Sequence, residues 1–217
     1  MADSEVRQEK VSNFTHEVLT FESAGERLVV RALVDAFTLK TEGIVGPAQP
    51  VELPIQLSAA ITPSGVRIEP SANNGCNAAE ATIATDLHNL LAPYPPQFSK
   101  GAVWRDTIVV SGCQAGIPIT TTTRRTFRVS GEVMYSGQPL ILVRRTDSLS
   151  ARGEGAYNQH RMMVEGRGVG TALYYLDITA GEISWLTMSQ SSQIRVTTSG
   201  RLHSFSQITS QEFVRVR

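Results

Sequence analysis

The second half of the chain is a series of long runs in which apolar and polar residues alternate. A period of two is typical of β-strands that bury one face, and these runs are rich in Thr and Val, which favour strands. Only short turns rich in Gly, Ser and Pro separate the runs, so consecutive strands are expected to pair in antiparallel order. The pattern predicts a β-meander with strands at residues 102–110, 117–135, 140–149, 161–178, 183–198 and 201–216.

Several of these predicted strands are much longer than a usual strand, so we expect a strongly curved sheet or half-barrel that wraps around other parts of the chain. The first third of the sequence predicts two hairpins, with strands at 14–21 and 27–39 and at 55–62 and 66–69. Residues 1–12 are charged and expected to be flexible, or to form a first edge strand. We expect a single, mainly β domain over residues 1–217.

One segment, residues 76–113, differs from the strands around it, and its first part predicts the only clear helix. Asn77 is a favourable N-cap, and Glu80 follows it at the spacing of a capping box. Apolar residues then recur at helical spacing until a proline cluster ends the helix, which is expected over residues 78–91. We expect this insertion to pack on the sheet together with the Pro-rich loop after it.

The chain has two cysteines, Cys76 and Cys113, one on either side of this insertion. A disulfide between them would stabilise the fold by about 4 kcal/mol in the chain-entropy model. The alternative is two unrelated buried thiols. A bridge favours an oxidising compartment, so we expect a periplasmic, extracellular or outer-membrane-associated protein whose signal sequence is not part of this chain.

Charge and motifs exclude several functional classes. The net charge is zero, which is unlike the basic excess of nucleic-acid-binding proteins, and no apolar run is long enough to span a membrane. The four histidines, His16, His88, His160 and His203, are far apart and lack metal-ligand spacing. His88 falls near the end of the predicted helix, where the helix dipole favours a cation. Without a catalytic motif, we expect no enzymatic activity, no cofactor and no metal.

Glycines at 166, 168 and 170 surround Arg167 in a pattern that resembles a phosphate-binding loop. No helix follows them and no lysine is near, so a bulge, a bend or close packing is the preferred interpretation.

Five arginines in the strands at 117–135 and 140–149 could form a basic stripe. If their hairpin is centred on Gly137 and Gln138, Arg128 lies level with Asp147. Such a stripe would suit anionic lipid head groups or an acidic protein partner. The alternative is a solvated face that Asp147 and Glu132 balance. The five candidates are Arg124, Arg125, Arg128, Arg144 and Arg145.

Methionines beside aromatic residues suit either a cavity for an apolar ligand or an ordinary core. The candidate lining residues are Ile83, Leu87, Leu90, Trp104, Met162, Tyr174, Trp185 and Met188.

The order of motifs in residues 90–217 resembles that of bacterial envelope proteins of lipoprotein type. The motifs are Tyr94-Pro95-Pro96, the segment from Lys100 to Trp104, the glycines around Arg167, and Tyr174 to Asp177 followed by Gly181. These proteins are similar to lipoprotein carriers of the LolA and LppX type. The resemblance implies a curved antiparallel sheet around an apolar cavity, and hence a non-enzymatic envelope protein that holds a lipid or another apolar molecule. The alternative is an interaction module that acts as an accessory subunit of a membrane or cell-surface complex.

Overall fold

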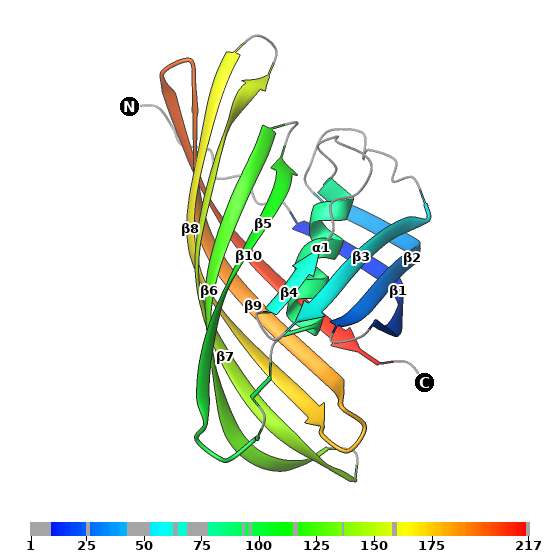
Figure 1. Cartoon of the computed structure of the whole chain (residues 1–217). Helices are drawn as coiled ribbons and strands as arrows, with labels where there is room; N and C mark the ends of the chain where they lie inside the picture. Colours follow the sequence, from blue (N-terminus) through cyan, green and yellow to red (C-terminus); the bar gives the residue numbers. More distant parts are fainter. Residues whose placement is uncertain are drawn as a thin grey trace. The chain divides into compact units, whose positions relative to one another are not determined.

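The computed structural model describes residues 10–24, 27–42, 53–62, 65–68, 78–92, 94–95, 97–114, 117–135, 137–157 and 160–215. These residues are mainly β, with one helix and two antiparallel sheets, as the alternation pattern predicts (Figure 1). Their contacts divide the chain into two compact units, residues 1–74 and 75–217. The expectation of one domain stays a prediction, and the two units are described separately.

The first unit is a four-stranded sheet in the order β1-β2-β3-β4. Its strands are β1 (Lys10–Ala24), β2 (Arg27–Glu42), β3 (Ile55–Thr62) and β4 (Gly65–Ile68). Both predicted hairpins are present. β1 begins inside residues 1–12, which were expected to be flexible or to form a first edge strand, and it lies at the edge of this sheet. Alternate residues of β2 are buried, and their partners on β3 are buried on the same face: Val30 with Ala59, Ala32 with Leu57, and Val34 with Ile55.

The second unit begins with α1 (Ala78–Leu90) and continues as a six-stranded meander in the order β10-β9-β8-β7-β6-β5. Each strand pairs with its neighbour along the chain, so the meander is confirmed (Figure 1). The half-barrel form stays a prediction. The strands are β5 (Val103–Gln114), β6 (Ile117–Tyr135), β7 (Gln138–Tyr157), β8 (His160–Asp177), β9 (Glu182–Thr198) and β10 (Arg201–Val214).

β7 is longer than predicted, because Gly153 and Gly155 are strand residues rather than breakers. A Cβ at Gly153 would lie 2.6 Å from the backbone oxygen of Pro118 on β6. Glycine therefore permits close packing inside the sheet here. Gly166, Gly168 and Gly170 also lie inside a strand, β8, which confirms that they are not a phosphate-binding loop.

The turn between β6 and β7 is tighter than predicted. Tyr135 pairs with Gln138 around a turn in which Gly137 has a φ of +79°, and a bulge between Val129 and Gly131 then shifts the register. As a result Arg128 lies opposite Arg144, rather than level with Asp147.

The main core of the second unit lies on one face of the sheet, around the fully buried Phe127 and Tyr174. The Pro-rich loop and β5 contribute Phe98 and Trp104 to it, and Trp104 stacks on Phe127 with ring centroids 5.0 Å apart. Leu90 at the end of α1 packs against the same cluster. The predicted packing of the helix and the Pro-rich loop on the sheet is therefore present.

Cys76 lies outside the described residues. The disulfide between Cys76 and Cys113, and the compartment inferred from it, stay predictions.

Candidate anion-binding surface

The two arginine pairs of the predicted stripe are divided between the faces of the large sheet. Neighbouring residues of a strand point to opposite faces. Arg125 and Arg145 are buried, with 1% and 4% of their surfaces exposed, whereas Arg124 and Arg144 are exposed. Arg125 and Arg145 are therefore excluded from an exposed stripe, whereas Arg124, Arg128 and Arg144 are exposed on one face. Contact of this face with an anionic partner stays a prediction.

Arg125 joins β5, β6 and the end of α1. Its Nε and Nη2 donate hydrogen bonds to the two carboxylate oxygens of Asp106, at 2.7 and 2.5 Å. Its Nη1 donates to the backbone oxygen of His88 at 2.7 Å. A carboxylate and the negative end of the helix dipole thus balance this buried charge.

Arg145 makes an equivalent connection from β7. Its Nη2 lies 2.8 Å from Oδ2 of Asp147, and its Nη1 donates to Oδ1 of Asn89 at 2.9 Å. Nη1 also contacts the hydroxyl of Tyr174, which donates to the backbone oxygen of Asn89 at 3.2 Å. These contacts hold the last turn of α1 against the sheet, so we name this side the helix face.

His88 is buried beside this network. Burial, followed by the nearby positive charge of Arg125, lowers the pKa of His88 from 6.5 to about 4. The ring is therefore neutral at pH 7, which corrects the expectation of a cation at the end of the helix. Its Nδ1 has no hydrogen-bond partner among the described residues. Burial also raises the pKa of Tyr174, so its hydroxyl keeps its proton.

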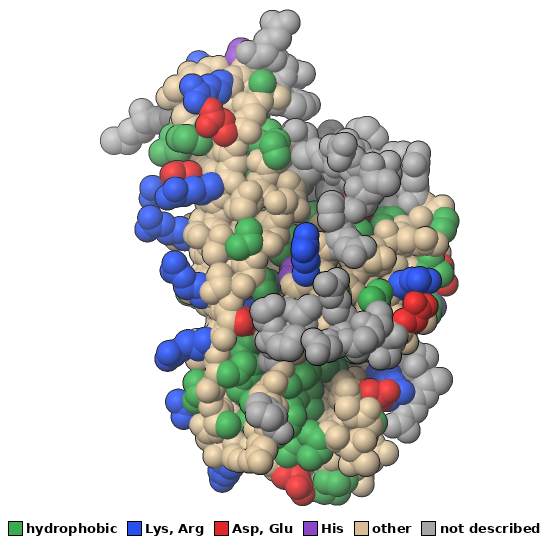
Figure 2. Space-filling model, viewed as in Figure 1, with side chains coloured by type: hydrophobic (Ala, Val, Ile, Leu, Met, Phe, Trp, Pro, Cys, Tyr) green, Lys and Arg blue, Asp and Glu red, His purple; other side chains and the backbone are tan. Residues whose placement is uncertain are grey.

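The opposite side of the sheet, which we name the arginine face, carries exposed arginines on five adjacent strands. Figure 2 shows Lys and Arg side chains following one another down the left side of the view, over the large sheet. Register and alternation assign eight arginines to this face: Arg105, Arg124, Arg128, Arg144, Arg152, Arg161, Arg167 and Arg195.

Part of the arginine face is balanced by acids. Glu165 lies between Arg152 and Arg195 on the neighbouring strands, and Arg161 forms an ion pair with Glu154. These positions have the charge pattern of an ordinary solvated sheet surface.

The positive charges of Arg128 and Arg144, in another part of the arginine face, have no acidic residue directly opposite them on the neighbouring strands that the structure describes. Arg128 lies directly opposite Arg144, and their outer neighbours are Val103 and Leu173. Like charges directly opposite each other destabilise a sheet.

The alternative to a basic stripe is a solvated face that Asp147 and Glu132 balance. It is wrong for Asp147, which pairs with Arg145 on the helix face, while Glu132 is exposed on β6 opposite Ile141 rather than opposite an arginine.

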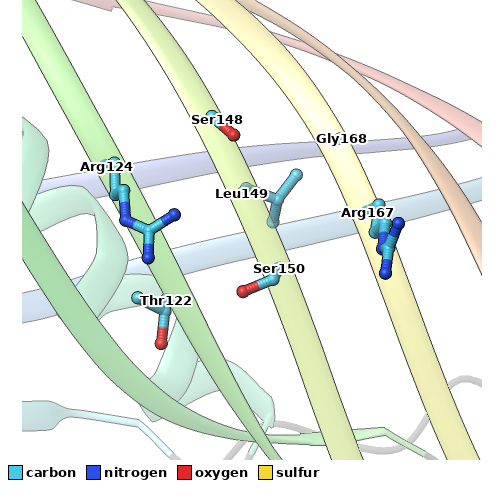
Figure 3. A pocket seen from close by; sticks show the side chains of 7 residues that line it. All are labelled: Thr122, Arg124, Ser148, Leu149, Ser150, Arg167 and Gly168. Atoms are coloured by element: carbon cyan, nitrogen blue, oxygen red, sulfur yellow. The ribbon is translucent and has the colours of Figure 1, made fainter.

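A shallow groove of about 240 Å³ crosses the arginine face over β6, β7 and β8. Figure 3 shows Arg124 and Arg167 on either side of Ser148 and Ser150, with Thr122 beside them. Leu149 and Gly168 complete the lining. The groove thus combines two guanidinium groups with three hydroxyl groups.

The residues expected to line an apolar cavity are divided among separate packing groups. Leu90, Trp104, Tyr174 and Met188 belong to the main core, while Met162 packs with Ile117 and Val164 in a second cluster. Ile83 and Leu87 are buried on α1. Trp185 stacks on Tyr135, with centroids 5.5 Å apart, and donates from Nε1 to Glu212. Binding of an apolar ligand stays a prediction.

Sequence reasoning missed several members of the arginine face because it considered only the arginines of one hairpin, with strands at 117–135 and 140–149. Arg105, Arg167 and Arg195 occupy the same face through alternation and register, which a count of alternate positions on each predicted strand would have suggested. The partners Asp106 and Asn89 carry no local signal, since each meets its arginine only in the folded chain.

Among the described residues, no group of His, Cys, Asp and Glu is arranged to hold a metal ion. In the same part of the chain, no helix has the length and hydropathy needed to cross a membrane. Comparisons with protein-family models, curated protein sequences and solved structures find no match to this chain.

Proposed function

We propose that this chain is a non-enzymatic docking module of the cell envelope that binds an anionic membrane surface through its arginine face. The observation that supports this most is the unbalanced pair Arg128 and Arg144, in a chain whose net charge is zero. Exposed like charges in direct opposition cost stability, and an anionic surface would remove that cost.

The electrostatic free energy that several exposed arginines contribute is sufficient for reversible binding to an anionic membrane. A basic residue close to an anionic leaflet contributes about 1 kcal/mol. An open sheet presents several arginines to one surface together, and exposed aliphatic residues on the same face, Val109, Val169 and Ile208, add apolar contact.

A membrane fits this face better than an acidic protein does. Protein interfaces usually concentrate their binding energy in a few residues that cluster in well-packed pockets near the centre of the interface. Here the charges are spread over β5 to β9, and the aliphatic residues stand singly between them. The envelope location is part of the proposal, because it rests on the predicted disulfide and on the resemblance to envelope proteins.

Vesicle co-sedimentation tests docking. We expect the chain to bind vesicles of phosphatidylcholine mixed with phosphatidylglycerol, and not vesicles of phosphatidylcholine alone. The double variant Arg128→Gln/Arg144→Gln should lower the partition coefficient roughly 30-fold, from two charges at about 1 kcal/mol each. Added salt should weaken binding, since the Debye length is about 10 Å at 0.1 M.

Arg31→Gln is the matched control, because Arg31 is exposed on β2 in the first unit and pairs with Glu22. It should bind the anionic vesicles as the unchanged chain does. Equal losses in the control and in the double variant, or no binding of the unchanged chain at low salt, would overturn the proposal.

A further inference from the structure

The groove on the arginine face has a composition that the rest of the face lacks. Its two arginines come from β6 and β8 and stand on either side of β7. Thr122 pairs with Ser150, Ser150 pairs with Arg167, and Arg124 pairs with Ser148. Strand spacing and rise place the Cα atoms of the two arginines roughly 12 Å apart, so both guanidinium groups can approach a ligand between them.

The guanidinium groups in this groove have no carboxylate partner within the described part of the chain. The cross-strand neighbours of Arg124 are Thr107 and Ser148, and those of Arg167 are Ser150 and Gln193, all of them uncharged. Glu165 is two residues from Arg167 on the same face, but Arg152 and Arg195 lie on either side of it. Both groove arginines therefore remain able to bind an anion.

The donors match a tetrahedral oxyanion. Arginine binds phosphate through two parallel N–H donors, and such charge-assisted bonds are roughly twice as strong as neutral ones. Hydroxyl groups of Ser148 and Ser150 between the arginines can donate to the remaining oxygens. A volume of about 240 Å³ leaves room for the group that carries the phosphate.

We infer that this groove is a binding site for a phosphomonoester group, held between Arg124 and Arg167 over the hydroxyls of β7. The inference rests on the proposed docking function, since the groove belongs to the same face, and it adds selectivity for one head-group chemistry. The phosphomonoester could be carried by a lipid or by a soluble molecule, and both present the same oxygens to the site.

Two measurements on the full chain distinguish these sources. The first is calorimetric titration with inorganic phosphate and with glycerol 3-phosphate. The second is co-sedimentation with vesicles that contain phosphatidic acid, a phosphomonoester, or phosphatidylglycerol, a phosphodiester, at matched surface charge. We expect binding of the soluble phosphates and a preference of about tenfold for phosphatidic acid.

Three double variants test whether phosphate binding and the preference for phosphatidic acid depend on the groove. Arg124→Gln/Arg167→Gln should abolish the calorimetric signal and the preference for phosphatidic acid, while binding to both vesicle types weakens. Ser148→Ala/Ser150→Ala should reduce the preference several-fold without removing a charge. Arg128→Gln/Arg144→Gln should weaken both vesicle types alike and keep the preference.

The outcomes separate this inference from docking. Binding of soluble phosphate that requires Arg124 and Arg167, without vesicle binding, would support the site and overturn docking. If binding of soluble phosphate requires Arg124 and Arg167 but the two vesicle types bind equally, the site would be assigned to a soluble phosphomonoester. Vesicle binding without a preference and without a calorimetric signal, or equal loss of phosphate binding in Arg128→Gln/Arg144→Gln, would overturn the site.

Discussion

Arg145 shows how a single residue can carry a charge inside the fold. Its guanidinium is almost fully buried, yet Asp147, Asn89 and the hydroxyl of Tyr174 surround it. A buried ion pair contributes little net stability, but removal of one partner leaves the other charge uncompensated. Arg144, the preceding residue, is exposed and lies opposite another arginine. The adjacent arginines therefore have opposite roles.

This contrast can be measured by urea unfolding. We expect Arg145→Met to lower the free energy of unfolding by about 3–5 kcal/mol, because Asp147 stays buried without its partner. Arg144→Met should change it by less than about 0.5 kcal/mol, with a small gain from relieved repulsion. Arg145→Met/Asp147→Leu should recover much of the loss. Equal effects of the two single variants would contradict the assignment of the faces.

The buried His88 is expected to make the free energy of unfolding depend on pH. Its pKa is about 4 in the folded chain and 6.5 when it is unperturbed, so the unfolded state binds a proton first as the pH falls. The contribution of the neutral His88 ring to the free energy of unfolding is therefore fully present above pH 6.5, and it is lost as the pH drops toward 4.

Chemical unfolding at a series of pH values tests this dependence. We expect a loss of up to about 3 kcal/mol between pH 6.5 and pH 4 from this ring. His88→Gln should have a flatter profile over that range, whatever its stability at pH 7. An unchanged slope in the variant would show that other groups cause the loss.

The long strands β6 and β7 approach each other closely at two glycines of β7. Gly153 and Gly155 lie two residues apart on β7, above Ile119 and Ile117 of β6. A Cβ at Gly153 would meet the backbone of Pro118, which cannot move without the strand. A Cβ at Gly155 would lie 3.2 Å from Cγ2 of Ile117, a side-chain atom that can shift.

Substitution of each of the two glycines by alanine therefore tests this difference, with Gly155 as the matched control for Gly153. We expect Gly153→Ala to lower the free energy of unfolding by about 1–3 kcal/mol, the usual cost of overpacking. Gly155→Ala should cost clearly less. Thermal unfolding monitored by circular dichroism compares the two variants, and an equal or greater loss in Gly155→Ala would contradict this account of the β6–β7 contact.

The whole large sheet has two chemically different faces. One face binds the end of α1 through buried arginines and an aromatic core, and the other exposes arginines and hydroxyls to solvent. Because the net charge of the chain is zero, acidic residues elsewhere offset the arginine excess on this face. Such a charge asymmetry orients a protein at an anionic surface, and it is the basis of the proposed docking.

Local chemistry along the chain is enough to predict part of this structure. Period-two alternation specifies strands, short glycine turns specify a meander, and the residues from Asn77 to Pro96 specify one helix. Which arginine of each pair is buried is known only from the folded chain, because it depends on where α1 packs. Arg145 and Asp147 share a face because they are two residues apart on β7, but only the folded chain buries that face under α1. That Arg124 lies near Arg167 depends on the bulge between Val129 and Gly131 and on pairing across three strands, and a one-residue change of register between two of these strands would place the two side chains on opposite faces.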